Sequence, residues 1–311
     1  MDISLKQITY FLQVVQSKSF TMAAASLNIS QPALSIAMSQ LEKSLGVPLL
    51  QRGSHPLHPT EFGEIFHCYA QQVRHDLENA RDAISALNSG TIGRLNLCLG
   101  PSAAGVEISS VLSSMVADFP AAEIQAFTGV LPAVAERVRS GEFSVYLGTV
   151  SPDFDDEMLE ISTLAKLPLR VVAGARHPLA DGRCVTAAEL ACYPLLAIGD
   201  LDANLPHWRF AFQQAGVAAP DPAIRVRDLT LVRAMLMHTD FFTIMPLSMA
   251  RPDIDSGSLA VIHPERFDWS LDLKAVTRAG SILPAACRIF LERVIAAFNK
   301  RALSDHGSGP H

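Results

Sequence analysis

Residues 17–52 read SKSFTMAAASLNISQPALSIAMSQLEKSLGVPLLQR, and this stretch decides how the N-terminal part of the chain folds. Two short helical patterns are separated by a tight turn at residues 27–30. Ser30 and Pro32 suit a helix start, because a serine side chain caps free N–H groups and proline is tolerated in the first turn. The pattern predicts helices over residues 20–28 and 31–45.

The second of these helices has two different faces. Apolar residues spaced three and four apart form one face, which is typical of a buried side: Leu34, Met38, Leu41 and Leu45. The opposite face carries Gln31, Pro32, Ser35, Ile36, Ser39 and Lys43. A short helix that is buried on one face and small and polar on the other can enter the major groove of DNA. The stretch therefore predicts a double-stranded DNA partner.

Composition limits the class of protein. The chain has 311 residues, enough for two or three domains, and with 49% hydrophobic and 18% charged residues it is globular rather than disordered. There is no run of 18 apolar residues, so no transmembrane helix is expected. The start MDISLKQITYF has polar residues where a secretory signal needs an apolar core. We expect a cytoplasmic protein without a membrane partner.

The net charge of −6 argues against a nucleic-acid partner, but the acidic residues lie mostly outside the N-terminal segment, which weakens this argument. Residues 1–60 hold four basic and two acidic residues, which gives that segment a net charge of +2. This is sparse for a DNA-binding domain, because affinity from phosphate neutralisation scales with the number of contacts. We expect one domain alone to bind weakly and several to act together.

The cysteines and histidines show no metal-binding or disulfide pattern. The five cysteines are odd in number and lack C-x-x-C spacing, which favours reduced thiols: Cys68, Cys98, Cys184, Cys192 and Cys287. The histidines lack ligand spacing, so neither a metal nor another cofactor is expected. We expect buried, inert thiols.

A long helix is predicted after a short wing. Residues 51–59 contain two prolines and a glycine and read as an extended hairpin wing. Thr60 caps a helix that runs to about residue 88. Its apolar positions lie three or four apart: Phe62, Phe66, Tyr69, Val73, Leu77, Ala80, Ile84 and Leu87. Such a stripe favours pairing with a second copy, the alternative being packing on its own domain.

From Arg94 onward the pattern alternates between strands and helices, which implies a mostly parallel sheet with right-handed crossovers. The predicted strands cover residues 95–99, 123–127, 145–148, 169–173, 195–198, 224–226, 242–245 and 271–277. The predicted helices cover residues 106–118, 131–140, 187–191, 208–215, 229–237 and 287–300.

The whole chain resembles a LysR-type transcriptional regulator. SFTMAAASLNISQPALS followed five residues later by LEKSLGVPLLQR is similar to that family's winged helix-turn-helix, and Pro59-Thr60-Glu61-Phe62-Gly63 is similar to its next helix start. Three further segments fall where the family's effector domain has similar ones: residues 93–95, 176–179 and 242–246.

The resemblance implies four parts. These are a winged helix-turn-helix DNA-binding domain at 1–60, a linker and dimerisation helix at 61–90, an effector-binding domain at 91–303 and a loose tail at 304–311. The effector domain would be two Rossmann-like α/β subdomains of the type 2 periplasmic-binding-protein kind. Subdomain I would span 92–163 and 268–300, and subdomain II 165–266. A small-molecule effector between them would modulate promoter binding by a homodimer or homotetramer and the response of RNA polymerase.

The resemblance also implies DNA-contacting residues. Ser30, Gln31, Pro32 and Ser35 approach DNA, whereas Thr21 and Arg52 touch the backbone or minor groove; the alternative for Thr21 and Ser30 is capping alone. The sequence departs from the family at Met22 and Ile36, where a basic residue is common. Ile36 lies on the predicted DNA face with Ser39, and three alternatives are open for it: it contacts a thymine methyl group, it weakens binding, or it packs on the wing. The implied dimer contacts are Phe62, Phe66, Tyr69, Val73, Leu77 and Ile84.

For the effector, similar proteins use the loop after the first strand, here residues 100–105. The candidates by position are Ser102, Ala103, Val130, Thr149, Asn204 and Thr230, each with a turn or cap as the alternative. These are mostly neutral, whereas Arg225, Arg227 and Arg233 lie nearby, so both neutral and acidic effectors stay open.

Other functions fit the residues less well. Gly100-x4-Gly105 lacks the Lys-Ser/Thr of a P-loop, and Ser102 lacks the Gly-x-Ser-x-Gly spacing of a hydrolase, so no enzyme is expected. A small-molecule binding protein without a DNA role would not need the N-terminal helix pair. In the peroxide-sensing relatives a reactive cysteine follows the strand that corresponds to residues 195–198, whereas residues 199–206 here contain none.

Overall fold

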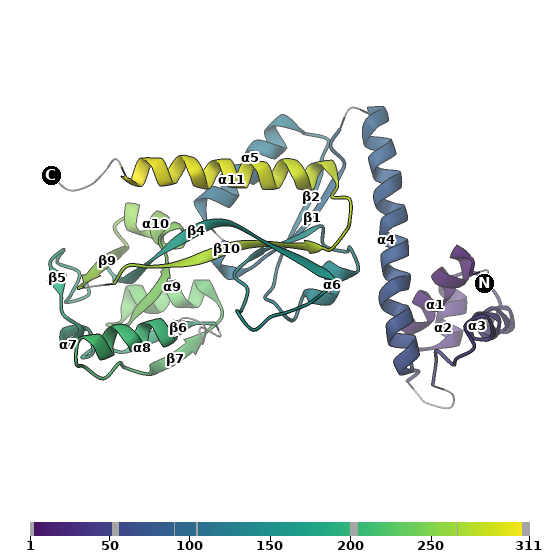
Figure 1. Cartoon of the computed structure of the whole chain (residues 1–311), viewed down its shortest axis with the longest axis horizontal. Coiled ribbons are helices and arrows are strands. Elements are labelled where there is room, and N and C mark those ends of the chain that lie inside the picture. Colours follow the sequence, from purple (N-terminus) through teal and green to yellow (C-terminus); the bar gives the residue numbers. More distant parts are fainter. Residues whose placement is uncertain are drawn as a thin grey trace.

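The computed structural model describes residues 3–51, 56–89, 91–103, 105–199, 205–265 and 267–306. Two predicted site residues, Arg52 and Asn204, lie outside these ranges. Figure 1 shows a small helical unit at the N-terminus, one long helix beside it, and an elongated α/β unit on the other side of that helix. Within the described ranges, no helix is long and apolar enough to cross a membrane.

The N-terminal unit contains three helices: α1 (Leu5–Ser17), α2 (Phe20–Ser26) and α3 (Gln31–Leu45). Phe11, Leu34 and Leu41 are fully buried in a core shared by all three helices. Asn28 takes a left-handed φ of 53° in the turn between α2 and α3, a conformation that asparagine tolerates better than most residues. The sequence prediction of a helix pair in residues 20–45 is confirmed.

Helix α4 (Glu61–Ser89) follows a single antiparallel bridge between Leu50 and Pro59. The Thr60 hydroxyl accepts the Gly63 N–H at 3.0 Å, which confirms the predicted cap. Gly63 is required here, because a Cβ at this position would overlap the Leu49 carbonyl oxygen. The base of the predicted wing and the start of α4 are therefore built as one unit.

The α/β unit has a ten-stranded sheet with the order β2-β1-β3-β10-β4-β8-β6-β7, and β9 and β5 lie off this path. Subdomain I contains the following elements: β1 (Arg94–Leu99), a 3-10 turn η1 (Pro101–Ala103), α5 (Val106–Asp118), β2 (Glu123–Thr128), α6 (Ala135–Arg139), β3 (Val145–Gly148) and α11 (Ala285–His306). Phe290 and Val294 of α11 are buried against Leu97 and Val145 of these strands.

Subdomain II contains the following elements: β5 (Cys184–Val185), α7 (Ala187–Leu190), β6 (Leu195–Ile198), α8 (Leu205–Gln214), β7 (Pro222–Val226), α9 (Leu229–His238), β8 (Phe242–Pro246), α10 (Leu247–Asp255) and β9 (Leu259–Pro264). One core contains Trp208 and Phe212 of α8, and a second core on other residues of the same strands contains Val232 and Leu236 of α9. The sheet of subdomain II is thus covered by helices on both faces.

Two long strands join the subdomains: β4 (Leu159–Gly174) and β10 (Trp269–Arg278). They pair antiparallel from Trp269↔Leu169 to Arg278↔Leu159, with one irregularity at Leu273/Lys274 (Figure 1). The pairs of β4 with β8 and with β9 are antiparallel as well, whereas the pairs of β1, β6 and β7 are parallel. The prediction of a mostly parallel sheet is therefore wrong for the central strands β4 and β10, which pair antiparallel with their neighbours.

Several element predictions also need correction. Helix α6 covers only Ala135–Arg139, because residues 131–134 form turns. Strand β4 begins ten residues before the predicted 169–173 segment. Helix α10 and strands β5 and β9 were not predicted. Cys184 and Cys192 are exposed, which contradicts the expected burial of the thiols, whereas Cys98 and Cys287 are buried.

Candidate DNA interface and effector site

Helix α3 presents a small, exposed face. The Ser30 hydroxyl accepts the Ala33 N–H at 3.4 Å and so caps the helix. Gln31, Pro32 and Ser39 are exposed, and Ser35 is half-buried. Ile36 is 60% exposed, which is unusual for isoleucine within a folded domain. The structure therefore leaves this predicted face uncovered.

Helix α2 adds a second exposed position beside that face. Ser19 caps α2 through the Met22 N–H at 3.4 Å, so Thr21 is not needed as the cap. Thr21 is exposed, and Met22 is 64% exposed.

Glu42 positions the segment that leads into the predicted wing. Its Oε1 accepts the Leu49 N–H at 2.8 Å and the Leu50 N–H at 3.2 Å. Thr60 holds the same segment through that segment's carbonyl groups, since the Thr60 N–H donates to the Leu49 carbonyl at 2.9 Å and its hydroxyl donates to the Pro48 carbonyl at 2.7 Å. Sequence reasoning counted Glu42 only as a charge, because its partners are seven and eight residues away.

Helix α4 exposes most of the predicted apolar stripe. Phe62, Tyr69, Val73, Leu77 and Ile84 are all exposed, and Ile84 is 63% exposed. Phe66 differs from them, because its ring lies 5.0 Å from that of Phe11 in an edge-to-face contact within the N-terminal unit. Ile65, which the sequence analysis did not select, is 60% exposed. A contiguous apolar surface of this kind marks a contact site on a protein.

Another face of α4 contacts subdomain I through hydrogen bonds and ion pairs. His75 Nδ1 lies 2.7 Å from the Ser140 carbonyl oxygen, and Asp76 forms an ion pair with Arg278 at the end of β10. His67 Nδ1 lies 3.9 Å from Glu136 Oε1 of α6. Burial lowers the pKa of His67 below its usual value, while Glu136 and Glu64 oppose this shift. These contacts, which we call the α4 latch, connect α4 to subdomain I, and the pair of Asp76 with Arg278 reaches the end of the crossing strand β10.

Two effector candidates, Ser102 and Thr149, meet after the ends of β1 and β3. The Ser102 hydroxyl accepts the Thr149 N–H at 3.1 Å, and both Ser102 and Ala103 are buried. The Tyr146 hydroxyl donates to the Thr149 carbonyl at 3.1 Å, and burial raises the pKa of Tyr146 to about 12. A Cβ on Gly100 would lie 2.6 Å from that hydroxyl oxygen, so this corner has no space for a side chain.

The two subdomains touch where α5 and α10 begin. A Cβ on Gly105 would lie 3.1 Å from the Cβ of Ser248 and 3.3 Å from Glu107 Oε2. Ser248 is therefore a second hydroxyl at this junction, although it was missed because α10 was not predicted. The Glu107 carboxyl is buried in the first turn of α5, where the helix dipole favours a negative charge.

The remaining effector candidates, Val130 and Thr230, form no hydrogen bond with the corner at Ser102 and Thr149 among the described residues. Val130 is 41% exposed in the loop after β2, and Thr230 is exposed in the first turn of α9, which Asp228 caps through the Leu231 N–H at 2.8 Å. Arg233 is held by Asp253 at 2.8 Å and by the Met249 carbonyl, so its charge is already neutralised.

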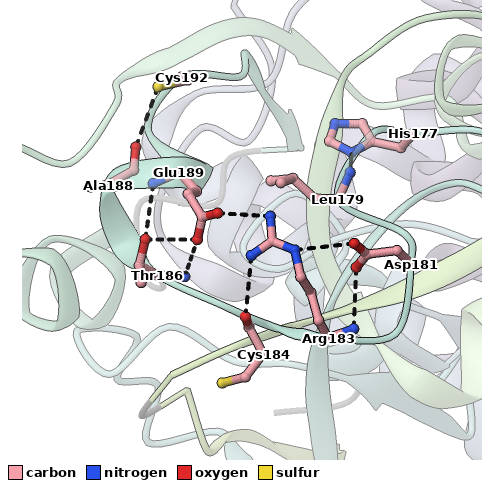
Figure 2. Close-up of polar contacts among 9 residues, drawn as sticks. All are labelled: His177, Leu179, Asp181, Arg183, Cys184, Thr186, Ala188, Glu189 and Cys192. Carbon is pink, nitrogen blue, oxygen red and sulfur yellow. Dashed lines mark hydrogen bonds and ion pairs between the residues drawn. The ribbon is translucent and has the colours of Figure 1, made fainter.

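The two exposed cysteines lie on either side of a polar network in subdomain II. Arg183 bonds Asp181 at 3.1 Å and Glu189 at 2.7 Å, and Figure 2 shows this network between Cys184 and Cys192. The pKa of Glu189 falls to about 2, because Arg183 and then the Thr186 N–H and hydroxyl bond its carboxylate. The Cys192 thiol donates to the Ala188 carbonyl at 3.4 Å. Among the described residues, no group of three metal-ligating side chains occurs.

Comparison with known families assigns both parts of the chain. Residues 5–64 match the family described as bacterial regulatory helix-turn-helix protein, lysR family, and residues 88–299 match the LysR substrate binding domain. The chain belongs to the LysR family. It is thus a DNA-binding transcriptional regulator with a substrate-binding domain, which confirms the resemblance read from the sequence.

Individual relatives of this LysR-family chain cover nearly its whole length. The SDS degradation transcriptional activation protein of a Pseudomonas species is 27% identical over 91% of this chain and 92% of its own. Among solved structures, CbnR bound to its target DNA has a TM-score of 0.67 and 21% identity, covering 95% of this chain and 100% of CbnR. A full-length OxyR variant from Pseudomonas aeruginosa has a TM-score of 0.68 and 19% identity, covering 94% of this chain and 95% of its own.

Proposed function

We propose that this LysR-family regulator binds an inverted repeat in promoter DNA as a dimer or tetramer, and that a small effector between its two subdomains changes this binding. The observation that carries the proposal is the uncovered face of α3, with Gln31 and Ile36 exposed beside a capped helix start. CbnR, whose fold is similar, forms a complex with its target DNA, which supports a DNA partner for this chain. Each dimer would place recognition helices in successive major grooves about 34–36 Å apart.

The assignment of roles within the DNA interface is tested by two substitutions. Gln31→Ala should relax base preference, because glutamine reads a base edge, whereas Arg52→Ala should weaken binding to all sequences alike. Both are measured by mobility shift on DNA upstream of the regulator's own gene, over a range of salt concentrations. Absence of salt-sensitive binding by folded protein contradicts the DNA proposal. Equal losses from both variants on every site contradict the assigned roles.

We propose that the exposed stripe of α4 pairs with a second copy. Phe62, Ile65, Tyr69, Val73 and Leu77 are apolar yet exposed, which supports an interface here. Phe66 would stabilise the N-terminal unit through Phe11 rather than contact the partner. The double substitution Tyr69→Glu and Leu77→Glu should lower the mass in analytical ultracentrifugation. Arg81→Glu adds the same charge at an exposed position outside the stripe and should leave the mass unchanged.

We infer that the effector signal reaches DNA through the α4 latch. Residues 129–134 connect β2, near the effector candidates, to α6, which touches α4 through Glu136 and His67. A Cβ on Gly129 would lie 3.0 Å from the Cys98 sulfur, so this segment is packed closely on the strands. Movement of subdomain I would therefore be transmitted to α4, to the N-terminal unit and to RNA polymerase at the promoter.

We further infer that the chain acts in the cytoplasm and without catalysis. Its matched relatives are named as transcriptional regulators. The Ser102 hydroxyl is occupied by the Thr149 N–H, and among the described residues no histidine bonds it as a catalytic base would. A thermal-shift screen of metabolites on the full chain tests the effector proposal, since a ligand at 100 times its Kd adds about 2.7 kcal/mol of stability. Loss of that shift in Ser248→Ala, but not in Ser256→Ala, would place the ligand between the subdomains.

A further inference from the structure

Subdomain II contains a cavity of about 240 Å³ that none of the effector candidates lines. Leu169 and Arg170 of β4 form one wall, Ile244 of β8 another, and Phe267, Asp268 and Trp269 close it from the segment that leads into β10. An engineered cavity of about 150 Å³ holds benzene, so this one has room for a ligand somewhat larger than benzene.

The cavity results from a change of partner along β4. Leu169 pairs with Trp269 of β10, but Val171 pairs with Ile262 of β9. Arg170 falls in the step between these two pairs and has a strand partner only on the other edge, where it faces Met245 of β8. The sheet is therefore interrupted at Arg170 on the side where the cavity opens.

Two opposite charges line this cavity without neutralising each other. Arg170 Nη1 donates to the Leu169 carbonyl at 2.7 Å, a neutral acceptor. Across the described residues, no carboxylate lies within ion-pair distance of Arg170, and no cation lies within that distance of Asp268. A guanidinium binds a carboxylate through paired hydrogen bonds, and a carboxylate binds an ammonium group. The two side chains thus complement a ligand that carries both charges.

The rest of the lining is mainly apolar, with the exposed His263 as its one further polar side chain. Leu169, Ile244 and Ile262 are aliphatic, and Phe267 and Trp269 add two aromatic rings whose centroids are 4.6 Å apart. Such walls favour a hydrocarbon group, and an aromatic face also attracts a cation.

We propose that this cavity is a second ligand site, which takes a free α-amino acid with an apolar side chain. Arg170 binds the carboxylate, Asp268 binds the ammonium group, and the side chain fills the apolar part. The site goes beyond the proposed effector site between the subdomains and does not depend on it. Because Leu169 and Trp269 form the last pair of the two crossing strands, the ligand adjoins the connection between the subdomains.

The test is isothermal titration calorimetry of the full chain with L-leucine. We expect saturable binding, and binding at least about tenfold weaker for 4-methylpentanoate, which lacks the ammonium group, and for 3-methylbutylamine, which lacks the carboxylate. Arg170→Gln and Asp268→Asn should each raise the Kd about tenfold. The controls Arg176→Gln and Asp272→Asn change exposed residues outside the cavity and should stay within about twofold of the parent.

Tryptophan fluorescence gives an independent readout. The chain has two tryptophans, Trp208, which is 1% exposed, and Trp269, which lines the cavity. L-leucine should change the emission of the parent but not that of Trp269→Phe. Absence of heat at about 10 mM L-leucine with folded protein overturns the proposal, since that concentration detects even millimolar affinity. Equal binding of the singly charged ligands also overturns it, as does loss of L-leucine binding in Ser248→Ala. If Arg170→Gln fails to fold, the exposed Asp268→Asn decides.

Discussion

Replacing Glu42 with alanine should release the segment that leads from α3 into the predicted wing. Its carboxylate accepts two backbone N–H groups, from Leu49 at 2.8 Å and from Leu50 at 3.2 Å. These bonds fix the chain between α3 and α4, so the substitution acts on the shape of the DNA-binding unit and not on any residue of the exposed α3 face. Glu42→Gln keeps one oxygen as acceptor but removes the charge.

The size of the effect follows from the two bonds. A hydrogen bond to a charged group contributes about 1.5–3 kcal/mol, and water replaces part of this at a half-buried site. We therefore expect Glu42→Ala to lower the local opening free energy by about 2 kcal/mol and Glu42→Gln by about 1 kcal/mol. A loss of 2 kcal/mol corresponds to roughly 30-fold faster exchange of the amides concerned.

Hydrogen–deuterium exchange of the segment 46–51 measures this directly, because the Leu49 and Leu50 amides are the two that Glu42 protects. Gln40→Ala serves as the control, since Gln40 is exposed on the same helix. Exchange in Glu42→Ala that matches the parent would refute the reasoning. A general acceleration throughout α1–α3 would also refute it, because the effect would then be global unfolding.

Three further predictions concern pH, the α4 latch and the start of α4. Burial lowers the pKa of His177, whose Nδ1 accepts the Leu179 N–H at 3.1 Å only when the ring is neutral. An unfolded histidine titrates near 6.5, so the unfolded chain binds more protons; the stability from this group is complete above pH 6.5 and falls as the pH drops below it. His177→Gln should flatten this dependence of Tm on pH. Arg278→Gln should cost only about 0.5–1 kcal/mol, because Asp76 is half exposed, yet increase the radius of gyration in solution scattering, and an unchanged radius would contradict a restraining latch. Gly63→Ala should lower Tm and DNA affinity together at a cost of about 1–3 kcal/mol, whereas Ala83→Gly on the same helix should cost about 1 kcal/mol and spare DNA binding.

The sequence predicted the elements whose signals are local. Helix α5 and strands β3 and β6 have the predicted bounds, because each is a short periodic segment between clear turn residues. Helix α10 was missed because Pro246 and Pro252 interrupt its pattern. The first half of β4 was missed because it crosses between subdomains with exposed residues such as Ser162 and Thr163, so its alternation is weak.

The sequence predicted where the candidate site residues lie along the chain, but not which residues of other elements they contact. The exposed faces of α3 and α4 follow from helical spacing within one segment. The bond from Glu42 to Leu49, the approach of Gly105 to Ser248 and the packing of Phe66 on Phe11 join different elements. Spacing along a chain does not reveal such pairs, since they depend on how the elements are folded onto one another. The exposure of Cys184 is of the same kind, because it lies on the two-residue edge strand β5, whose partner among the described strands is β9.

Strand β10 and helix α11 lie near the C-terminus of the chain, so subdomain I is the last part that can finish folding during synthesis. Strand β3 is finished at Gly148, yet its neighbour β10 begins at Trp269, and Phe290 of α11 is needed to cover the same core. At about 5–20 residues per second, the first strands of subdomain I therefore stay uncovered for roughly 6–30 s after they emerge. The DNA-binding unit and the sheet of subdomain II have all their strands and helices before that time. A nascent chain can thus present a folded α3 face before the part that regulates it is complete, and truncation before residue 269 would leave subdomain I without its last strand and its covering helix.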